Sequence, residues 1–228
     1  MDVFGKALAD YYQKGKASTL WLHNSYDEPE EMPIDVFFRE EDDMPELEHR
    51  ALALCRGKIL DVGAGVGSHA LWLQQHGFEV TAIDISETAV EIMRNRGVKN
   101  ALVQDIFALE KKYDTLLFMM NGIGLTGTLP GFVGFLAKAK TLINPKGQLI
   151  FDSSNIAYLY NDLPMPNSHY FGEVSYCYEY QQQKGKWFNW LYLDQQTLLR
   201  TAQQCGWHCT ICYDDGEDQY LAKLELPA

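Results

Sequence analysis

The sequence has no cluster of lysine and arginine, and its formal net charge at pH 7 is −12. Binding to a nucleic-acid backbone depends on clustered basic side chains, so this composition disfavours a nucleic acid as substrate or partner. Every apolar run is much shorter than the roughly 20 residues of a membrane-spanning helix, so no membrane partner is expected. The first residues lack a basic stretch followed by an apolar one, so no secretory signal is expected.

Cysteine is also scarce, with five residues scattered through 228. A chain of this length can bury a full hydrophobic core without disulfide bonds, so the expected setting is reducing and cytoplasmic. Cys205, His208, Cys209 and Cys212 lie close together in sequence. They span a helix end and a predicted strand, where Cys209 and Cys212 face opposite ways, and the pattern predicts no metal site.

The chain is organised around a glycine-rich stretch that follows a short apolar run. Lys58–Val62 has the composition of a buried parallel strand, and glycines follow at positions 63, 65 and 67. A helical pattern then begins at Ser68. This succession aims free backbone N–H groups and the positive end of a helix at a ligand. The pattern therefore predicts a site for a nucleotide-type cofactor.

The spacing of these glycines distinguishes between cofactors. The dinucleotide fingerprint G-x-G-x-x-G would place its third glycine at position 68, where this chain has Ser68. The stretch instead reads D-x-G-x-G-x-G and resembles the first motif of class I S-adenosylmethionine-dependent methyltransferases. The resemblance implies S-adenosyl-L-methionine as cofactor and S-adenosyl-L-homocysteine as product. The residues that it assigns to the cofactor here are Asp61, Gly63, Ala64, Gly65 and Gly67.

The resemblance also assigns residues at the ends of the next three predicted strands. An acid in the place of Asp84 can accept both ribose hydroxyls, although dehydrogenases use an acid there for the same purpose. The family places an acid on the adenine amino group where this chain has Asp105. The simpler alternatives are that Asp84 caps a helix and that Asp105 is a loop acid. The full set of positions carried over from these strand ends is Asp84, Ile85, Asp105, Ile106, Phe107, Asn121 and Gly122.

Alternating strand and helix patterns over residues 58–152 predict a parallel sheet with helices on both faces. The predicted strands cover residues 58–62, 78–84, 98–104, 113–120 and 148–152. The helices predicted after residue 62 cover 68–76, 86–97, 130–143 and 194–205. An antiparallel pair over 207–213 and 219–226 closes the chain, as it does in this methyltransferase family. The expected fold is α/β and Rossmann-like, with a seven-stranded, mostly parallel sheet and a C-terminal antiparallel strand.

The other segments are expected to extend a single domain over residues 1–228. Residues 1–55 form an N-terminal helical extension or flap, with a helix or helical pair to about residue 22, a loop over 23–46 and a further helix to Leu54. The remaining parts are the cofactor-binding core at 56–153, an inserted loop and antiparallel β-hairpin at 155–193, and the closing helix and strands at 194–228. Residues 156–168 read as loop, and 173–180 with 187–193 as the hairpin.

The apolar stretch Ile34–Arg39 has two interpretations. It either anchors the N-terminal extension to the domain or forms a flap over the cofactor. In the second case Phe37 or Phe38 covers the cofactor and Arg39 pairs with its carboxylate. Both interpretations can hold together.

Methyl transfer from a sulfonium is an in-line displacement, so an enzyme mainly aligns the reactants and excludes water. A hydroxyl or amine acceptor also needs a base. The catalytic residue is unassigned, and the candidates are Asp152, at the end of the fifth predicted strand, and His23 or His169 if their loops fold over the site.

The acceptor is expected to be a small molecule, with the methylated atom unassigned. Methyltransferases of nucleic-acid amines carry Asn/Asp-Pro-Pro-Tyr/Phe after the fourth strand, where this chain reads Asn121-Gly122-Ile123-Gly124. The aromatic hairpin could wall an acceptor pocket, bind a cation, form a dimer surface or pack on the core. The protein is expected to be a monomer or a homodimer.

Two functions outside this class remain as alternatives. An NAD(P)-dependent oxidoreductase is disfavoured by Ser68 and by the closing antiparallel strands. A non-catalytic, cofactor-binding regulatory protein would bind the cofactor tightly without turnover.

Overall fold

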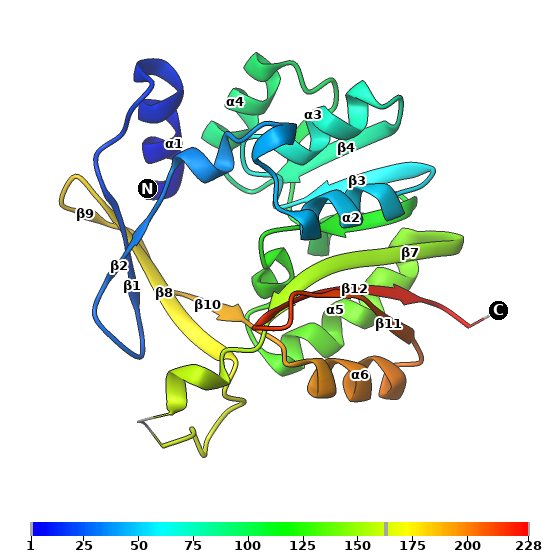
Figure 1. Ribbon diagram of the computed structural model, residues 1–228. Coiled ribbons are helices and arrows are strands. Elements are labelled where there is room, and N and C mark those ends of the chain that lie inside the picture. Colours follow the sequence, from blue (N-terminus) through cyan, green and yellow to red (C-terminus); the bar gives the residue numbers. More distant parts are fainter. Residues whose placement is uncertain (1, 162–163, 228) are drawn as a thin grey trace.

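The computed structural model describes residues 2–161 and 164–227, and its centre is a seven-stranded sheet (Figure 1). The strand order is β11-β12-β7-β6-β3-β4-β5, in which β3 to β7 run parallel and β12 runs antiparallel to both of its neighbours. The strands are β3 (Lys58–Val62), β4 (Glu79–Asp84), β5 (Ala101–Val103), β6 (Tyr113–Phe118), β7 (Ile143–Ser154), β11 (His208–Asp214) and β12 (Gln219–Glu225).

Helices cover both faces of this sheet because its central strands are apolar on both sides. Leu60 and Leu116 pack toward one layer of helices, and their chain neighbours Ile59 and Leu117 pack toward the other. This two-sided burial is typical of parallel strands. The first layer consists of α5 (Leu129–Leu142) and α6 (Gln195–Gln204), and the second of α2 (Glu46–Leu54), α3 (Ser68–Gln75) and α4 (Glu87–Arg96).

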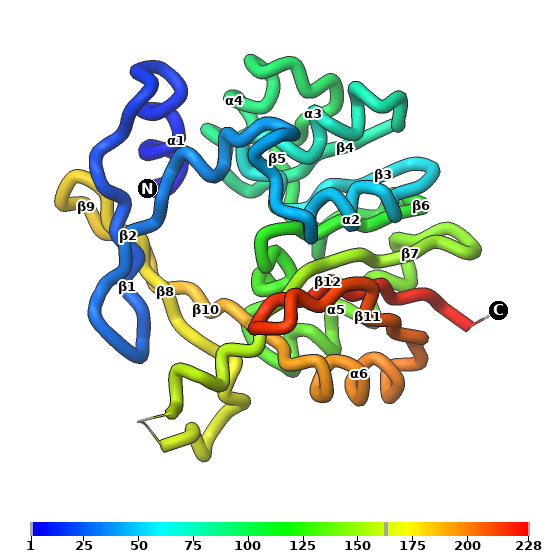
Figure 2. The backbone as a smooth tube through the Cα atoms, in the orientation of Figure 1, coloured from blue at the N-terminus to red at the C-terminus, as the bar shows by residue number. Residues whose placement is uncertain are grey.

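A second, antiparallel sheet stands apart from the core sheet and joins two distant parts of the chain (Figures 1 and 2). Its order is β10-β8-β1-β2, with β9 beside β8. The strands are β1 (Leu20–Asn24), β2 (Glu30–Met32), β8 (Glu173–Tyr180), β9 (Gln183–Lys184) and β10 (Phe188–Leu191). The helix α1 (Val3–Lys14) lies at one end of this sheet and also contacts α4.

The expectation of helix to about residue 22 and of loop over 23–46 is wrong in part. The helix α1 ends at Lys14, where Gly15 takes a left-handed conformation and donates its N–H to the Tyr11 carbonyl. Residues 20–24 are a strand, since their buried and outward side chains alternate and they pair with β8 from Leu20 opposite Tyr180. The expected loop over 23–46 likewise contains β2 and two short 3-10 turns, Asp35–Phe37 and Glu41–Asp43.

The predicted hairpin exists as β8 and β10, but it does not stand alone. The strand β8 lies between β10 and β1 and therefore has partners on both edges. Its second partner is separated from it by about two thirds of the chain. Local sequence patterns report only local pairing, so this sheet could not be assembled from them.

Smaller differences concern the strand ends and the insertion. The strand expected over 98–104 shrinks to Ala101–Val103, because the N–H groups of Val98 and Lys99 bond to Met93 and to the Gln74 side chain instead. Residues 144–147, which separate the predicted helix at 130–143 from the predicted strand at 148–152, lie inside β7, where Lys146 has a φ of 64°. The expected loop over 156–168 includes a 3-10 turn at Ala157–Tyr160, and its residues 162 and 163 lie outside the described part.

Within the described residues, no helix combines the length and the apolar character that crossing a membrane requires.

Candidate active site

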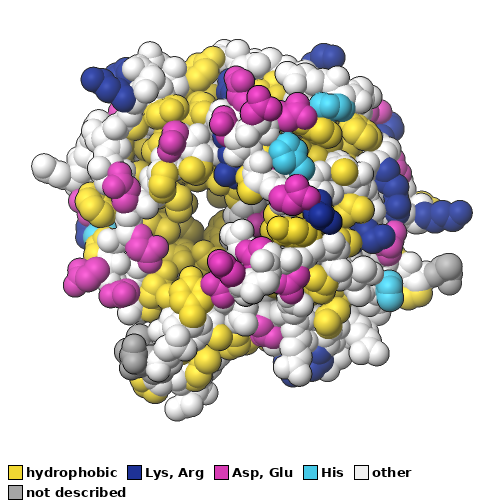
Figure 3. Space-filling view, viewed as in Figure 1, with side chains coloured by type: hydrophobic (Ala, Val, Ile, Leu, Met, Phe, Trp, Pro, Cys, Tyr) yellow, Lys and Arg dark blue, Asp and Glu magenta, His cyan; other side chains and the backbone are white. Residues whose placement is uncertain are grey.

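A cavity of about 1210 Å³ lies between the carboxyl ends of the parallel strands and the second sheet. Side chains at the ends of β3, β4 and β7 form its floor, and side chains of β1, β8 and β10 form its roof. Figure 3 shows this hollow, with hydrophobic side chains in its interior and acidic side chains around its rim. Ligands of open α/β sheets bind at this edge, so the cavity is the candidate active site.

The glycine-rich turn forms one wall of the cavity. Gly63 and Gly65 have φ values of 66° and 55°, a conformation that side chains with a Cβ rarely adopt. The Gly65 N–H donates to Asp84 Oδ2 at 3.0 Å, and the Ser86 N–H donates to Asp84 Oδ1 at 2.9 Å. Burial raises the pKa of Asp84, while these two hydrogen bonds act in the opposite direction. The backbone therefore fixes both carboxylate oxygens of Asp84 at the cavity.

A buried ion cluster lies beside this turn. Glu48, only 3% exposed, accepts a hydrogen bond from Arg39 Nη2 and pairs with His69 Nε2 at 2.7 Å. Burial lowers the pKa of His69, but the hydrogen bond and the charge of Glu48 outweigh burial and leave this pKa above its ordinary value. The sequence does not single out Glu48, because an acid in the first turn of a helix is common. Nothing in the sequence indicates that Arg39 and His69 are its partners.

Three buried polar atoms around the cavity have no hydrogen-bond partner among the described residues: Arg39 Nε, Asp61 Oδ2 and Asp152 Oδ1. Burial raises the pKa of Asp61 to about 6 and that of Asp152 to about 7. Buried polar atoms in native proteins nearly always have a partner. One donor and two acceptors are thus left for groups of a ligand.

Apolar side chains line the opposite end of the cavity. Ile85 is 78% exposed and Phe107 is 45% exposed, and both line the cavity together with the buried Ile106. Asp105 Oδ1 accepts the Phe107 N–H at 2.9 Å, which holds the turn that carries these residues. This end of the cavity fits a flat, largely apolar group.

The structure brings together most of the residues predicted from the sequence. Those that line the cavity are Phe37, Arg39, Asp61, Gly63, Ala64, Gly65, Asp84, Ile85, Asp105, Ile106, Phe107, Asn121, Gly122 and Asp152.

Gly67, although part of the motif, does not line the cavity. A Cβ on Gly67 would lie 2.8 Å from Val98 Cγ2, so this glycine allows the turn to pack against the end of α4 and the residues after it.

Both predicted histidines lie outside the cavity. His23 is on the outer face of β1 and pairs with Glu179 Oε2 at 2.7 Å. His169 is exposed and pairs with Ser168 Oγ at 3.0 Å. The condition that their loops fold over the site is therefore not met, and Asp152 is the remaining catalytic candidate.

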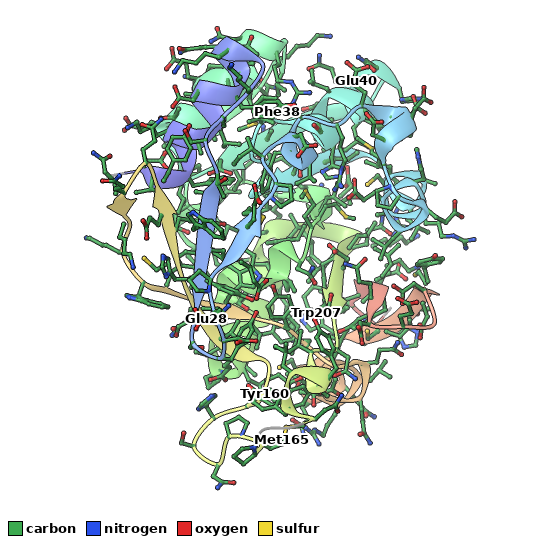
Figure 4. All side chains as sticks on the ribbon, turned by 60° about the vertical axis from the view of Figure 1, so that its left-hand side comes forward. Glu28, Phe38, Glu40, Tyr160, Met165 and Trp207 are labelled. Carbon is green, nitrogen blue, oxygen red and sulfur yellow. The ribbon has the colours of Figure 1, made fainter. Side chains whose placement is uncertain are left out.

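Phe37 and Phe38 of the stretch Ile34–Arg39 have different contacts. Phe37 lines the cavity and packs edge-on against Phe4, with ring centroids 5.0 Å apart. Phe38 instead anchors the stretch to α1, where its ring lies 4.8 Å from that of Tyr11 (Figure 4).

The second glycine-rich turn joins the floor to the roof. The Asn121 N–H donates to Asp152 Oδ2 at 2.8 Å. A Cβ on Gly124 would lie 2.1 Å from Trp190 Nε1, so the absence of a side chain at Gly124 makes room for the indole. Trp190 lines the cavity from β10. The sequence alone gives no sign of the contact between Gly124 and Trp190.

The roof of the cavity is aromatic. Tyr176, Tyr178, Phe188, Trp190 and Tyr192 line it, and their ring contacts include Tyr178–Phe188 at 5.4 Å and Phe188–Trp190 at 6.1 Å. Of the roles left open for the hairpin, this arrangement supports a pocket wall. Among residues 2–161 and 164–227, no group of three or more His, Cys, Asp or Glu side chains is placed to hold a metal ion.

Comparison with known proteins identifies the family. Residues 37–210 match the family of the methyltransferase domain. The chain belongs to this family. Its fold and sequence are similar to those of the SAM-dependent methyltransferase from Bacteroides fragilis, solved in complex with S-adenosyl-L-homocysteine, with 39% identity, a TM-score of 0.92 and coverage of 100% of this chain and 95% of that chain. The sequence-based resemblance to class I S-adenosylmethionine-dependent methyltransferases is confirmed.

More distant methyltransferases share parts of the chain or only its fold. CcbJ methyltransferase from Streptomyces caelestis has a TM-score of 0.62 at 14% identity, covering 83% of this chain and 99% of that chain, which shows the fold alone. The ubiquinone biosynthesis O-methyltransferase of Coxiella burnetii is 32% identical over 117 residues, which cover 46% of this chain and 48% of that protein. The chain thus spans about half the length of this curated relative, and 21% of another, the S-adenosyl-L-methionine-dependent Diels-Alderase iccD of Talaromyces variabilis.

Proposed function

We propose that this methyltransferase transfers the methyl group of S-adenosyl-L-methionine to a small-molecule acceptor inside the cavity between its two sheets. The observation that carries this proposal is that three unpartnered, buried polar atoms and the ends of β3, β4 and β7 surround one cavity. When bound, the cofactor supplies a methyl group activated by a positively charged sulfur. The chain's own contribution is to hold both molecules in line and to exclude water.

The side chains around the turn fit the amino-acid part of this cofactor. Arg39 Nε is a free donor for its carboxylate, and Asp61 Oδ2 is a free acceptor for its ammonium group. Glu48 holds the Arg39 guanidinium in place through Nη2. A zwitterion needs one group of each kind, and this wall of the cavity offers both.

The other end of the cavity fits the nucleoside. The Asp84 carboxylate, oriented by two backbone N–H groups, has lone pairs left for the ribose hydroxyls. Ile85 and Phe107 offer apolar surface to the adenine, and Asp105 lies beside them for its amino group. These assignments extend the sequence-based predictions for the same residues.

A small acceptor is supported by the roof. Residues 1–55 contribute β1 and β2 to the roof, and residues 155–193 contribute β8 and β10. These two segments are additions to the core at 56–153, and they cover the proposed cofactor site. Residues 194–228 instead complete the core sheet. Extra segments that cover a site commonly act as lids or as specificity elements. A roofed cavity suits a small molecule better than a nucleic acid.

The proposed setting is cytoplasmic, with the protein as a monomer or a homodimer. All five cysteines are free, as a reducing compartment would keep them.

Isothermal titration calorimetry with S-adenosyl-L-homocysteine tests the cofactor assignment, and transfer of a labelled methyl group to a panel of small acceptors tests the activity. We expect binding and turnover. Binding without turnover over a broad panel would favour the regulatory alternative, and selective binding of NADH would favour the oxidoreductase. Absence of binding to the sulfur-containing ligands would overturn the proposal.

A further inference from the structure

Three tyrosine hydroxyls form a hydrogen-bonded chain along the roof, and this chain ends on Glu30. Tyr26 donates to Glu30 Oε1 at 3.0 Å. The hydroxyl oxygens of Tyr26 and Tyr176 lie 3.3 Å apart, and those of Tyr176 and Tyr192 lie 3.2 Å apart. Tyr176 and Tyr192 line the cavity, so the chain connects the cavity to a carboxylate at its far end.

The carboxylate fixes the direction of every hydrogen bond in this chain. A phenol has one proton to donate, and burial raises the pKa of all three phenols, which keeps them protonated at neutral pH. Because Tyr26 gives its proton to Glu30, Tyr176 must donate to Tyr26, and Tyr192 must donate to Tyr176. The hydroxyl of Tyr192 therefore has lone pairs but no proton left for a ligand in the cavity.

Asp152 offers a second acceptor to the same cavity. Its Oδ2 accepts the Asn121 N–H at 2.8 Å, and its Oδ1 has no partner among the described residues. Two charged side chains act on Asp152: Glu48 from α2 raises its pKa, and His69 from α3 lowers it. Glu48 and His69 are paired with each other. Arg39 is also paired with Glu48.

The Tyr192 hydroxyl and the Asp152 carboxylate thus offer two hydrogen-bond acceptors to a molecule in the cavity, beside the aromatic rings of the roof. A hydroxyl has one proton and serves one acceptor, whereas an amine has N–H groups for both. Aromatic faces such as those of Trp190 and Phe188 also attract a cation, the form in which an aliphatic amine arrives from water. Arg39 and His69 are paired with Glu48, so Lys186 is the remaining basic residue that lines the cavity. Its chain neighbour Gly185 lies against Val3 of α1.

We propose that the acceptor is a small-molecule amine whose nitrogen lies between the Tyr192 hydroxyl and the Asp152 carboxylate, and that Asp152 takes the proton which this nitrogen loses. The inference rests on the proposed function and names its substrate class. Asp152 first takes a proton from the bound ammonium group, which frees the nitrogen lone pair. The lone pair then forms the new bond to the methyl carbon, the carbon–sulfur bond breaks, and its electron pair stays on sulfur. The products are an N-methylammonium ion, the neutral thioether and protonated Asp152, so charge and atoms balance.

A panel of matched acceptors tests the substrate class. Benzylamine, phenethylamine, tyramine and histamine are each incubated with the full-length protein and labelled S-adenosyl-L-methionine, beside analogues that carry an alcohol, a thiol or a carboxylic acid in place of the amine. We expect N-methylated products, identified by mass spectrometry, from the amine series alone. Preferred methylation of another series, or no methylation of any amine by protein that still binds S-adenosyl-L-homocysteine, overturns this inference. Loss of S-adenosyl-L-homocysteine binding would instead overturn the proposed function.

Two variants test the assigned roles with the best amine found. Asp152→Asn keeps the shape of the side chain but cannot take a proton, and we expect kcat to fall about 10²-fold or more. Tyr192→Phe keeps the ring but removes the acceptor oxygen, and we expect the KM for the amine to rise severalfold with a smaller change in kcat.

The affinity for S-adenosyl-L-homocysteine should stay unchanged in both variants, which also verifies that they are folded. Tyr12→Phe, an exposed tyrosine of α1 outside the cavity lining, serves as the control. In the wild type, kcat should rise with pH as Asp152 ionises, and Asp152→Asn should lose this rise. An Asp152→Asn variant with wild-type kcat and pH profile contradicts the role of Asp152, and a Tyr192→Phe variant with unchanged KM contradicts the role of Tyr192.

Discussion

At the scale of single residues, Asp84 shows how the backbone prepares a carboxylate for a ligand. Two N–H groups, from Gly65 and Ser86, orient its oxygens before any ligand arrives. We expect Asp84→Ala to weaken binding of S-adenosyl-L-homocysteine by about 1–3 kcal/mol, since charged hydrogen bonds are lost. Calorimetric titration measures this change, with Asp42→Ala, an exposed acid outside the cavity lining, as the control. Equal affinities of the variant and the wild type would refute the ribose assignment.

Asp152 links the chemistry of the site to the stability of the protein. Burial raises its pKa from 3.8 to about 7, so folding favours the protonated carboxyl. This contribution to stability is fully present below pH 3.8 and is lost as the pH rises through about 7. We expect Asp152→Asn to leave the free energy of unfolding nearly unchanged at pH 4 and to raise it at pH 8 by on the order of 1–3 kcal/mol.

Urea unfolding of the ligand-free protein at both pH values measures this difference. The control is Asp42→Asn, which makes the same replacement at an exposed carboxylate that stays in contact with water. An equal effect of Asp152→Asn at the two pH values would show that the carboxyl titrates normally.

At the scale of elements, the turn Gly122–Thr126 and strand β10 fit together through one missing side chain. A methyl group on Gly124 would collide with the Trp190 indole. We expect Gly124→Ala to displace Trp190 and raise the KM for the acceptor severalfold, with a smaller change in the affinity for the cofactor, because the added methyl group collides with Trp190, which is not assigned to the cofactor. Steady-state kinetics with both substrates separates the two effects.

Gly134→Ala is the matched control for this substitution. Gly134 lies in α5 with open space where a Cβ would be, so the same change there should leave both KM values unaltered and stabilise the helix by about 0.5–1 kcal/mol. A larger effect of Gly134→Ala than of Gly124→Ala on the KM for the acceptor would contradict the packing described for Trp190.

The sequence predicts the core elements well because each carries its own local signal. The motif around Asp61 marks the turn, and an acid or amide marks the end of each following strand, at Asp84, Asp105 and Asn121. The parallel arrangement then brings these ends to one edge of the sheet. Gly67 belongs to the same motif but serves packing, a distinction that depends on the position of Val98 in space.

The roof and the ion cluster could not be predicted from the sequence, because the residues that contact one another in them are distant in sequence. Glu48 is set in a helix whose sequence fits any exposed first turn, and its pairing with His69 arises only in the folded molecule. In the same way Leu20–Asn24 is too short to reveal a strand without knowledge of β8. Long-range pairing is the information that a single sequence does not display.

At the scale of the whole molecule, the cavity lies between two sheets, and side chains from both of them line it. Binding to the folded form alone stabilises a protein by about 2.7 kcal/mol when the ligand is at 100 times its Kd. For a chain of this size that corresponds to a rise in Tm of roughly 5–10 °C. We expect this rise with S-adenosyl-L-homocysteine in differential scanning fluorimetry.

The Asp84→Ala variant should show a smaller shift at the same ligand concentration, since less of it is saturated. NADH provides the negative control for the class of cofactor. Equal shifts with both ligands, or none with either, would be inconsistent with the proposed site.

The pairing of β1 with β8 also has a consequence for synthesis. Leu20 leaves the ribosome long before Tyr180, its partner in the sheet, has been made. At about 5–20 residues per second, the first strand waits on the order of ten seconds or more for its neighbour. During that interval β1 can pair with β2, but the edge of β1 that later pairs with β8 has no partner. This unpaired strand edge is therefore a natural client for a chaperone, and the cavity acquires its full roof only after residues 173–191 have been made.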